Sequence, residues 1–348
     1  MAVAGTGSFG RNHLRVLREL EAAGEGVALV AAVEPNPERA EETSRQYTIP
    51  VFASVEDLLR ADLKLDAATV AVPTIHHHEV AAALLDAGLD LLVEKPLAAS
   101  LAEADDLILR AEKQGRIVQP GHLERFNPAV LAIEPHLKRP MFFEAHRLSV
   151  FTPRALDVDV VMDLMIHDLD VVLTFAKSQV SEVRAVGLPI VSPKVDIASV
   201  RVEFESGCVA NFTASRISTE RVRKLRFFEP REYVSIDYAR RDVLAIRMEA
   251  NIPPQLAAAL AAGKLDAAAL EKLTAEGPAP GLKFDKPEVA PGEPLKLEFL
   301  SFLDSVRKRC QPRVTARQGR AALELALAIQ AAMVAHAQRA GLGNFFKN

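Results

Sequence analysis

Short apolar runs and helical patterns alternate through the first third of the chain. Residues 27–33, 67–72 and 89–93 are almost wholly apolar, which is typical of strands buried on both faces of a parallel sheet. Between the last two runs, Val80 and Leu84 recur at the spacing of one helix face. This alternation predicts βαβ units, and therefore an α/β fold built on a doubly wound parallel sheet. Because only four residues precede the first glycine, we expect a short first strand.

Beyond about residue 122 the apolar positions follow a period of two. Residues 199–205 and 208–214 alternate apolar and polar side chains on either side of a Ser-Gly pair, which predicts an antiparallel hairpin. Further segments can add strands to this sheet or form amphipathic helices: strands at 181–190, 222–229 and 232–238, and helices at 297–306 and 319–340. A chain of 348 residues is too long for one ordinary core. We therefore predict two domains.

The composition and charge of the chain argue against several classes of binding partner. The net charge of −4 and the isoelectric point near 6.2 provide no basic surface for nucleic acid or an anionic membrane. Cys208 and Cys310 are the only cysteines and neither belongs to a metal-binding cluster, so we expect no disulfide framework and no metal. No apolar run approaches membrane-spanning length and no leader pattern opens the chain. A cytoplasmic protein is the expectation.

A glycine motif follows the first apolar stub and opens a segment with a helical pattern. Its residues are Gly5, Gly7, Ser8, Phe9 and Gly10, in the spacing G-x-G-x-x-G. In such a loop the first glycine makes the turn, the second lets the backbone approach a pyrophosphate, and the third packs against the sheet. The alternative is an ordinary glycine-rich turn, but the strand before and the helix after favour a dinucleotide site.

Glu34 stands just beyond the second predicted strand. A carboxylate at this place can accept hydrogen bonds from the hydroxyls of an adenosine ribose. A 2′-phosphate would meet a like charge here, and no Arg or Lys occupies positions 35–37, so NAD is favoured over NADP. A solvated loop acid is the alternative.

The sequence predicts two domains. A dinucleotide-binding Rossmann domain is expected over residues 1–121 and an α+β domain over residues 122–348.

Lys95 comes at the end of an apolar strand and precedes Pro96, which keeps the backbone extended. Ligands of open α/β sheets bind at the carboxyl ends of the strands. A lysine desolvated beside a nicotinamide could have a lowered pKa and share the proton of a substrate hydroxyl. Taken alone, however, Lys95 could equally be a surface lysine at a strand end.

Asp163 and His167 lie in an apolar segment at a spacing of four residues, so they share one face of a helix. The ordinary pKa of histidine makes His167 a plausible proton acceptor near neutral pH. Asp163 could orient that imidazole or hold a substrate hydroxyl. The alternative is a plain surface pair on a helix.

Three other features have open interpretations. The histidines at 76–78 cannot form one metal tripod, because consecutive helical residues project about 100° apart; capping or cleft-lining roles are favoured. The polar stretch at 122–128 suggests a cleft. A basic cluster could bind a diphosphate or blunt a solvated sheet edge, and it comprises Arg216, Arg221, Arg223, Lys224, Arg226 and Arg231.

Taken together, these motifs resemble the Gfo/Idh/MocA family of oxidoreductases over nearly the whole chain. The motifs are the glycine loop, Pro73 with His77, Glu94-Lys95-Pro96, and Asp163 with His167. The resemblance implies a Rossmann domain, a second α+β domain with a large open, mainly antiparallel sheet, and hydride transfer with NAD or NADP. It implies catalytic roles for Lys95, Asp163 and His167. The implied cofactor contacts are Gly5, Gly7, Ser8, Phe9, Gly10, Glu34, Pro73, His77, Glu94 and Lys95.

A narrower likeness comes from residues 121–128 and 159–168. Both stretches are similar to the branch of the family that oxidises the 3-hydroxyl of UDP-N-acetylglucosamine, which supplies a 3-keto sugar for the synthesis of 2,3-diamino sugars. This likeness implies a UDP-sugar as the small-molecule partner. Substrate contacts are expected from Lys95, Asp163 and His167. Charge and an expected place in the cleft add Arg125, Arg147 and Arg154 as candidates for the diphosphate or the sugar.

The resemblance also implies a homodimer or homotetramer formed through the sheet of the second domain. Two other functions remain open at this point. The chain could oxidise a free sugar or polyol such as an inositol, without a diphosphate site. It could also be a non-catalytic NAD-binding sensor or scaffold, although the joint presence of Lys95, Asp163 and His167 argues against that.

Overall fold

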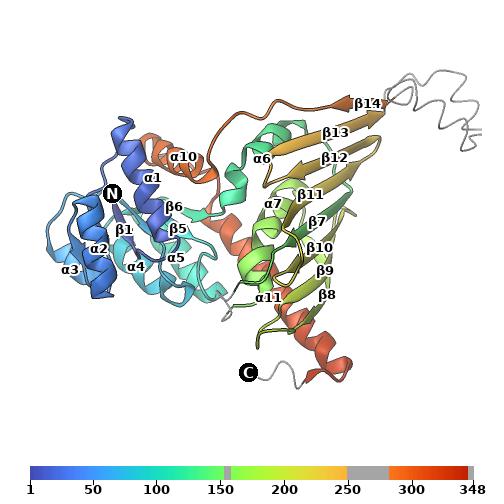
Figure 1. Cartoon of the computed structure of the whole chain (residues 1–348), viewed down its shortest axis with the longest axis horizontal. Coiled ribbons are helices and arrows are strands. Elements are labelled where there is room, and N and C mark those ends of the chain that lie inside the picture. Colours follow the sequence, from blue (N-terminus) through green and yellow to red (C-terminus); the bar gives the residue numbers. More distant parts are fainter. Residues whose placement is uncertain (153–157, 249–281, 344–348) are drawn as a thin grey trace, which may run out of the picture. The chain divides into compact units, whose positions relative to one another are not determined.

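The computed structural model of the chain describes residues 1–152, 158–248 and 282–343. Its residues form two compact units, which are described here one at a time (Figure 1). The first unit contains residues 1–127 together with 161–174 and 292–331, and the second contains the rest. Two segments that follow residue 127 by more than 30 positions thus complete the first unit. The boundary expected after residue 121 stays a prediction.

The first unit is built on a six-stranded parallel sheet in the order β3-β2-β1-β4-β5-β6. Its strands are β1 Ala2–Ala4, β2 Ala31–Val33, β3 Val51–Phe52, β4 Ala67–Val70, β5 Asp90–Glu94 and β6 Val118–Gly121. Val3 pairs with Ala32 on one side and with Thr69 on the other, so the order reverses at β1, where ligands of such sheets bind. The predicted doubly wound sheet is confirmed, and β1 is short, as expected.

Helices of the first unit begin and end where local chemistry favours it. They include α1 Gly10–Ala22, α2 Pro37–Tyr47, α3 Val55–Arg60, α4 His77–Asp86, α5 Leu101–Gln114 and α10 Pro294–Lys308. At the start of α5, Ser100 and Glu103 form a reciprocal capping box, which satisfies two N–H groups that the helix leaves unpaired. Gly115 ends α5 in the left-handed conformation, with φ of 61°.

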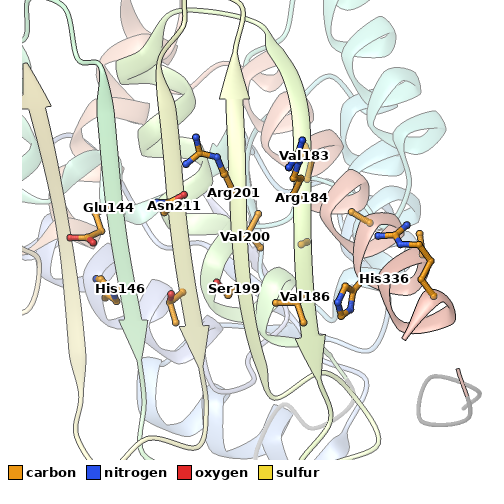
Figure 2. Close-up of a pocket in the computed structure, with 15 residues that line it drawn as sticks. Glu144, His146, Val183, Arg184, Val186, Ser199, Val200, Arg201, Asn211 and His336 are labelled. Atoms are coloured by element: carbon orange, nitrogen blue, oxygen red, sulfur yellow. The ribbon is translucent and has the colours of Figure 1, made fainter. Parts of the chain in front are cut away.

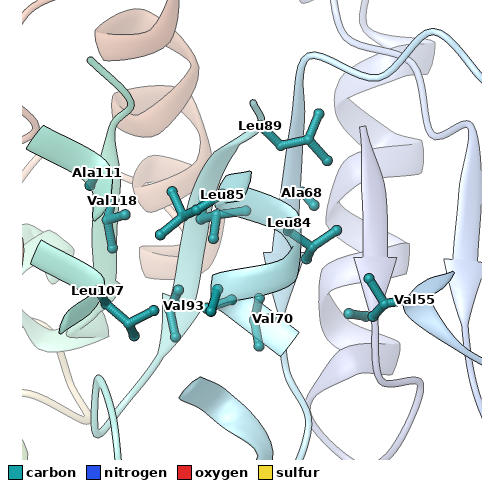
Figure 3. Close-up of a cluster of buried hydrophobic side chains, with 14 of the residues drawn as sticks. Val55, Ala68, Val70, Leu84, Leu85, Leu89, Val93, Leu107, Ala111 and Val118 are labelled. Atoms are coloured by element: carbon teal, nitrogen blue, oxygen red, sulfur yellow. The ribbon is translucent and has the colours of Figure 1, made fainter. Parts of the chain in front are cut away.

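An apolar cluster fills the space between each face of this sheet and its helices. On one face Leu85, Val93 and Leu107 belong to a buried cluster (Figure 3). The cluster on the other face includes Leu17 of α1 and Phe299 of α10. Truncating one such side chain to Ala typically costs about 2–5 kcal/mol. This two-sided burial explains why the strand sequences read as continuous apolar runs.

The second unit is built on an eight-stranded sheet in the order β14-β13-β12-β11-β7-β10-β9-β8. Its strands are β7 Phe142–Leu148, β8 Val180–Leu188, β9 Ile197–Phe204, β10 Val209–Ser215, β11 Val222–Glu229, β12 Glu232–Asp237, β13 Asp242–Met248 and β14 Leu282–Asp285. The predicted hairpin is β9 and β10, with Val202 opposite Ala210. All neighbours are antiparallel except β7 and β10, which run parallel. A large, mainly antiparallel sheet is therefore confirmed.

The basic cluster does not lie on a sheet edge. Arg223, Lys224 and Arg226 belong to β11, which pairs with β12 on one side and β7 on the other. The interpretation as a solvated edge is therefore wrong, because a one-strand pattern cannot reveal how many neighbours the strand has. Arg226 pairs with Glu144 of β7 across the strands, at 3.0 Å.

One face of this second sheet is apolar and buried. Phe143, Phe212 and Phe227 are fully buried on it, and Phe175 meets Phe227 edge-on with ring centroids 6.2 Å apart. The short helix α6, Pro128–Ile133, contacts β12 and β13. The opposite face carries half-buried and exposed polar side chains, as expected for an antiparallel sheet with one covered side.

The last long helix, α11, spans Ala316–Arg339. Among the described residues it is the one helix long and apolar enough to cross a bilayer, with a mean hydropathy of 1.3 over an 18-residue window. A core helix of a folded domain passes the same test, and Leu323 and Ile329 of α11 are fully buried. The feature is therefore weak evidence for a membrane. The sequence did not predict a membrane span here, because polar residues interrupt the apolar positions of 316–339.

Candidate active site

The glycine loop has the geometry that a dinucleotide needs. Gly5 adopts a φ of +89°, and a Cβ there would lie 2.7 Å from the carbonyl oxygen of Ala71. A Cβ on Gly10 would lie 1.9 Å from the carbonyl oxygen of Gly5, whereas one on Gly7 would meet only Arg39, at 3.9 Å. Gly5 and Gly10 thus allow the tight turn and the close packing of α1. Gly7 leaves its backbone open for a phosphate.

The N-terminus of α1 also favours the binding of a dinucleotide at this loop. Its N-cap residue, Phe9, makes no side-chain capping bond, so the partial positive charge of the helix end is available to an anion. Next to it lies a cavity of about 730 Å³, lined by the glycine loop, Glu34 and Pro73 among others. Cavities of this size hold cofactors and small ligands. The residues present therefore fit a dinucleotide.

Glu34 is buried in the wall of this cavity and is held from both sides. Its Oε2 accepts hydrogen bonds from the backbone N–H of Thr6, at 3.1 Å, and from the Thr6 hydroxyl, at 2.9 Å. Its Oε1 accepts from the backbone N–H of Asn36 and lies 3.2 Å from the Arg39 guanidinium. The carboxylate is thus fixed between the glycine loop and the start of α2.

Arg39 is a residue of this cavity that the sequence analysis missed. Positions 35–37, directly after Glu34, contain no Arg or Lys, but the first turn of the following helix folds back over the end of the strand. Asn36 caps α2 by accepting from the backbone N–H of Arg39, and this cap orients the turn. A search through that first turn would have found the guanidinium.

His77 contacts the chain itself with both ring nitrogens. Nδ1 lies 2.8 Å from the carbonyl oxygen of Pro96, and Nε2 lies 2.9 Å from that of Val72. Burial lowers the pKa of His77, and this effect outweighs the two carbonyls, which favour the charged ring. His77 thereby ties the loop after β4 to the turn that carries Lys95. Its assignment to cofactor binding stays a prediction.

The neighbouring histidines project elsewhere, as expected for consecutive positions. His78 pairs with Asp106 on α5, at 2.7 Å, whereas His76 is exposed and lines the cavity beside the glycine loop. Within the described ranges, no group of three or more His, Cys, Asp or Glu side chains could hold a metal ion.

Lys95 and Asp163 meet within the first unit although 68 residues separate them. The Lys95 Nζ donates to the carbonyl oxygen of Asp163, at 2.7 Å, and approaches that of Met162, at 3.4 Å. The carboxylate of Asp163 lies 3.9 Å from the same nitrogen. The Lys95 side chain is 18% exposed. An amine and a carboxylate are thus available side by side at the carboxyl end of β5.

Asp163 lies in a π-helical turn, Val161–Met165, and His167 lies in the first turn of α7, Ile166–Ala176. The predicted single helix is therefore two helical types in succession. Short π-helical turns occur frequently at functional sites, because they displace the backbone from the regular ladder. His167 is half-buried. The catalytic roles of Lys95, Asp163 and His167 remain predictions.

The arginines expected to bind a diphosphate lie in different surroundings. Arg125 is 3% exposed, lies 3.7 Å from Asp170 and donates to the Thr174 hydroxyl. In the second unit, Arg147 is 2% exposed and stands over the ring of Tyr238, 5.3 Å from its centroid. Arg154 lies outside the described residues. Burial of the first two favours a role in holding the fold, and their contact with substrate stays a prediction.

The stretch at 122–128 does not line an open cleft. Four of its polar side chains are buried: His122, Glu124, Arg125 and Asn127. Burial lowers the pKa of His122, and this effect outweighs the nearby Asp170 carboxylate. The expectation of a cleft is therefore corrected to buried polar contacts: His122 and Arg125 approach Asp170, and Asn127 donates to Glu124. Polar composition alone cannot distinguish the two, because a buried network contains the same residue types as a wet surface.

Comparison with known proteins agrees with this geometry. Residues 1–122 match the family model described as "Oxidoreductase family, NAD-binding Rossmann fold", and residues 130–229 match "GFO/IDH/MocA C-terminal domain". The chain belongs to the Gfo/Idh/MocA family. This member is thus an NAD-dependent oxidoreductase, which confirms the cofactor and the enzyme class expected from the sequence.

Among individual relatives, this family member is 31% identical over 338 residues to UDP-N-acetylglucosamine 3-dehydrogenase from Acidithiobacillus ferrooxidans, which covers 97% of this chain and 98% of that protein. A solved structure of the same enzyme superposes with a TM-score of 0.82 at 30% identity, over 100% of this chain and 98% of that one. The scyllo-inositol 2-dehydrogenase of Bacillus subtilis is 26% identical over 62% of this chain and 67% of its own length.

Proposed function

We propose that this enzyme oxidises the 3-hydroxyl of UDP-N-acetylglucosamine to a 3-keto sugar. The observation that carries the proposal is similarity along the full length, second unit included, to an enzyme with that activity. In sequence, the inositol dehydrogenase of Bacillus subtilis is similar over a smaller part of the chain and at lower identity, 26% over 62% of it. A 3-keto sugar is a substrate for transamination, so the reaction would serve the synthesis of 2,3-diamino sugars for lipid A or a surface polysaccharide.

The side chains around Lys95 would supply the proton chemistry. When bound, NAD accepts the hydrogen of the oxidised carbon as hydride. His167 takes the one proton of the hydroxyl group and Lys95 shares it through a hydrogen bond, while Asp163 orients the imidazole or holds a sugar hydroxyl. The distance of 3.9 Å between Lys95 and Asp163 supports a shared site, since it places a donor and an acceptor around one small volume.

The direct test is a panel of UDP-sugars and free polyols incubated with the purified protein and NAD. We expect NADH and a product two hydrogens lighter than the substrate from UDP-N-acetylglucosamine, with UDP acting as a competitor. Turnover of an inositol without competition by UDP would favour the polyol alternative instead. If no compound with a secondary hydroxyl reduced NAD, the sensor or scaffold alternative would replace the proposal.

We further propose that the enzyme works in the cytoplasm as a homodimer or homotetramer, without nucleic acid or membrane partners. Free cysteines in the described residues, Cys208 and Cys310, are compatible with a reducing compartment. The exposed face of β7, β10, β9 and β8 supports self-association. Together with the end of α11, it lines a broad hollow that runs from Glu144 and His146 on β7, past Arg201 on β9, to Val186 on β8 and His336 on α11 (Figure 2).

A surface that mixes both charges with apolar groups can be complementary to a second copy of itself across a two-fold axis. Replacing both Val186 and Leu188 with Arg should therefore dissociate the oligomer, because it adds two like charges to each side of the interface. Light scattering is expected to report the monomer mass of 37.8 kDa for this variant and a multiple of it for the wild type. Leu109→Arg, at an exposed position on α5, is the control. An unchanged mass in the double variant would refute the proposed interface.

A further inference from the structure

Glu94, the residue before Lys95, turns its carboxylate into the protein. Its Oε1 lies 2.9 Å from the Nε2 of His13, and its Oε2 accepts from the backbone N–H of Lys95 at 3.3 Å. A Cβ on Gly121 would lie 2.9 Å from that Oε1, so the carboxylate packs closely against β6. This one side chain therefore connects His13 to the backbone of Lys95.

His13 is fully buried in the first turn of α1, immediately after the glycine loop. Its ring meets Phe9 of that loop edge-on, with centroids 5.4 Å apart, and meets Phe299 of α10 in the same way at 5.2 Å. Two edge-to-face contacts leave the imidazole little freedom to rotate. The orientation of its Nε2 toward Glu94 is thus set by packing.

Glu298, which precedes Phe299 on α10, is a further buried acid of this region. Its carboxyl oxygens have no hydrogen-bond partner among the described residues. Burial above all, and then the charges of Glu94 and Asp170, raise the pKa of Glu298 well above its usual range. Burial thus favours the neutral form of Glu298 over a second carboxylate charge beside the His13–Glu94 pair.

We propose that the buried His13–Glu94 pair positions Lys95 and anchors it to the helix that begins at the NAD-binding loop. The contacts form an unbroken chain from Phe9 through His13 and Glu94 to Lys95. The inference rests on the proposed role of Lys95. Both members are positioning residues, since a misplacement of a reacting group by about 1 Å can cost on the order of 100-fold in rate.

The test uses His13→Phe, which keeps an aromatic ring between Phe9 and Phe299 but removes the bond to Glu94. Glu94→Gln, which preserves the side-chain volume, is the second variant. We expect each to lower kcat by about 10- to 100-fold while the protein stays folded. The dissociation constant of NAD should change little, because the Glu94 carboxylate faces His13 and does not line the cavity beside the glycine loop. The matched control is His78→Phe, which removes a histidine–carboxylate pair of 2.7 Å elsewhere in the same unit and should keep wild-type kcat.

A double variant separates positioning from general structural damage. If the pair acts through Lys95, adding His13→Phe to Lys95→Met should cost almost nothing more, because the positioned group is already absent. Independent, multiplying losses would overturn the proposal, as would wild-type kcat in both single variants or a joint loss of folding and NAD binding in both. Failure of the UDP-sugar assignment would appear in the wild type, so the variants are compared on whichever hydroxyl substrate the wild type oxidises.

Discussion

Lys95→Met will lower kcat by about 10²- to 10⁴-fold, the range that a positioned proton-transfer group contributes. Methionine keeps most of the length of the side chain, but its thioether can neither donate nor accept a proton. The loss is expected in kcat, with the affinity for NAD within a few fold of the wild type, because the glycine loop and Glu34 are untouched. Steady-state rates combined with NAD titration provide the measurement.

A stability measurement and a control variant distinguish lost chemistry from structural damage in this experiment. The Lys95 Nζ donates to the carbonyl oxygen of Asp163, so the melting temperature must be recorded to separate lost chemistry from a loosened π-helical turn. Lys113→Met, at an exposed position on α5, removes the same charge away from the site and should keep full activity. Turnover near the wild-type value in Lys95→Met would remove Lys95 from the proposed mechanism.

Gly10→Ala is expected to be the most damaging single methyl group in the first unit. The added Cβ would lie 1.9 Å from the carbonyl oxygen of Gly5, far inside contact distance, and that atom belongs to backbone that cannot rotate away. Overpacking of this kind costs about 1–3 kcal/mol or more. Thermal unfolding should show the loss, and calorimetric titration should show an NAD dissociation constant raised by at least about 100-fold, since α1 must leave the phosphate site.

Gly7→Ala is the informative partner of that variant. A Cβ on Gly7 would meet only the Arg39 guanidinium at 3.9 Å, so the protein should fold with a normal melting temperature but bind NAD weakly, because the methyl group occupies the approach of the pyrophosphate. Gly343→Ala, with nothing within 4 Å of the added atom, should change neither property. Wild-type stability and affinity in Gly10→Ala would show that the loop adapts and would contradict the packing argument.

The two experiments address different levels of the same site. Lys95 stands at the carboxyl end of β5 and Gly10 opens α1 next to β1, and His13 and Glu94 connect these elements through a buried bond of 2.9 Å. A defect confined to kcat and a defect in NAD binding can therefore be told apart. The buried pair predicts that the first kind of defect can arise from a residue that is not expected to touch the substrate.

The amino-acid sequence by itself determined the local elements and their chemistry. Period-two stretches such as 208–214 became strands of the second sheet, and the glycine spacing placed a tight turn before α1. These features follow from short-range physics: which side chains face a core, which positions need a φ that only glycine adopts readily, and which residues cap a helix. The family motifs could be recognised in the sequence for the same reason, because each of them is only a few residues long.

Only the tertiary structure decided which distant residues meet. It brought Asp163 to Lys95 and Glu94 to His13, and it placed β11 inside a sheet rather than at its edge. It also buried Arg125, whose charge had suggested a substrate contact. Strand order, burial of charge and side-chain convergence depend on pairings between segments tens to hundreds of residues apart, and the periodicity of one segment carries no record of its partners.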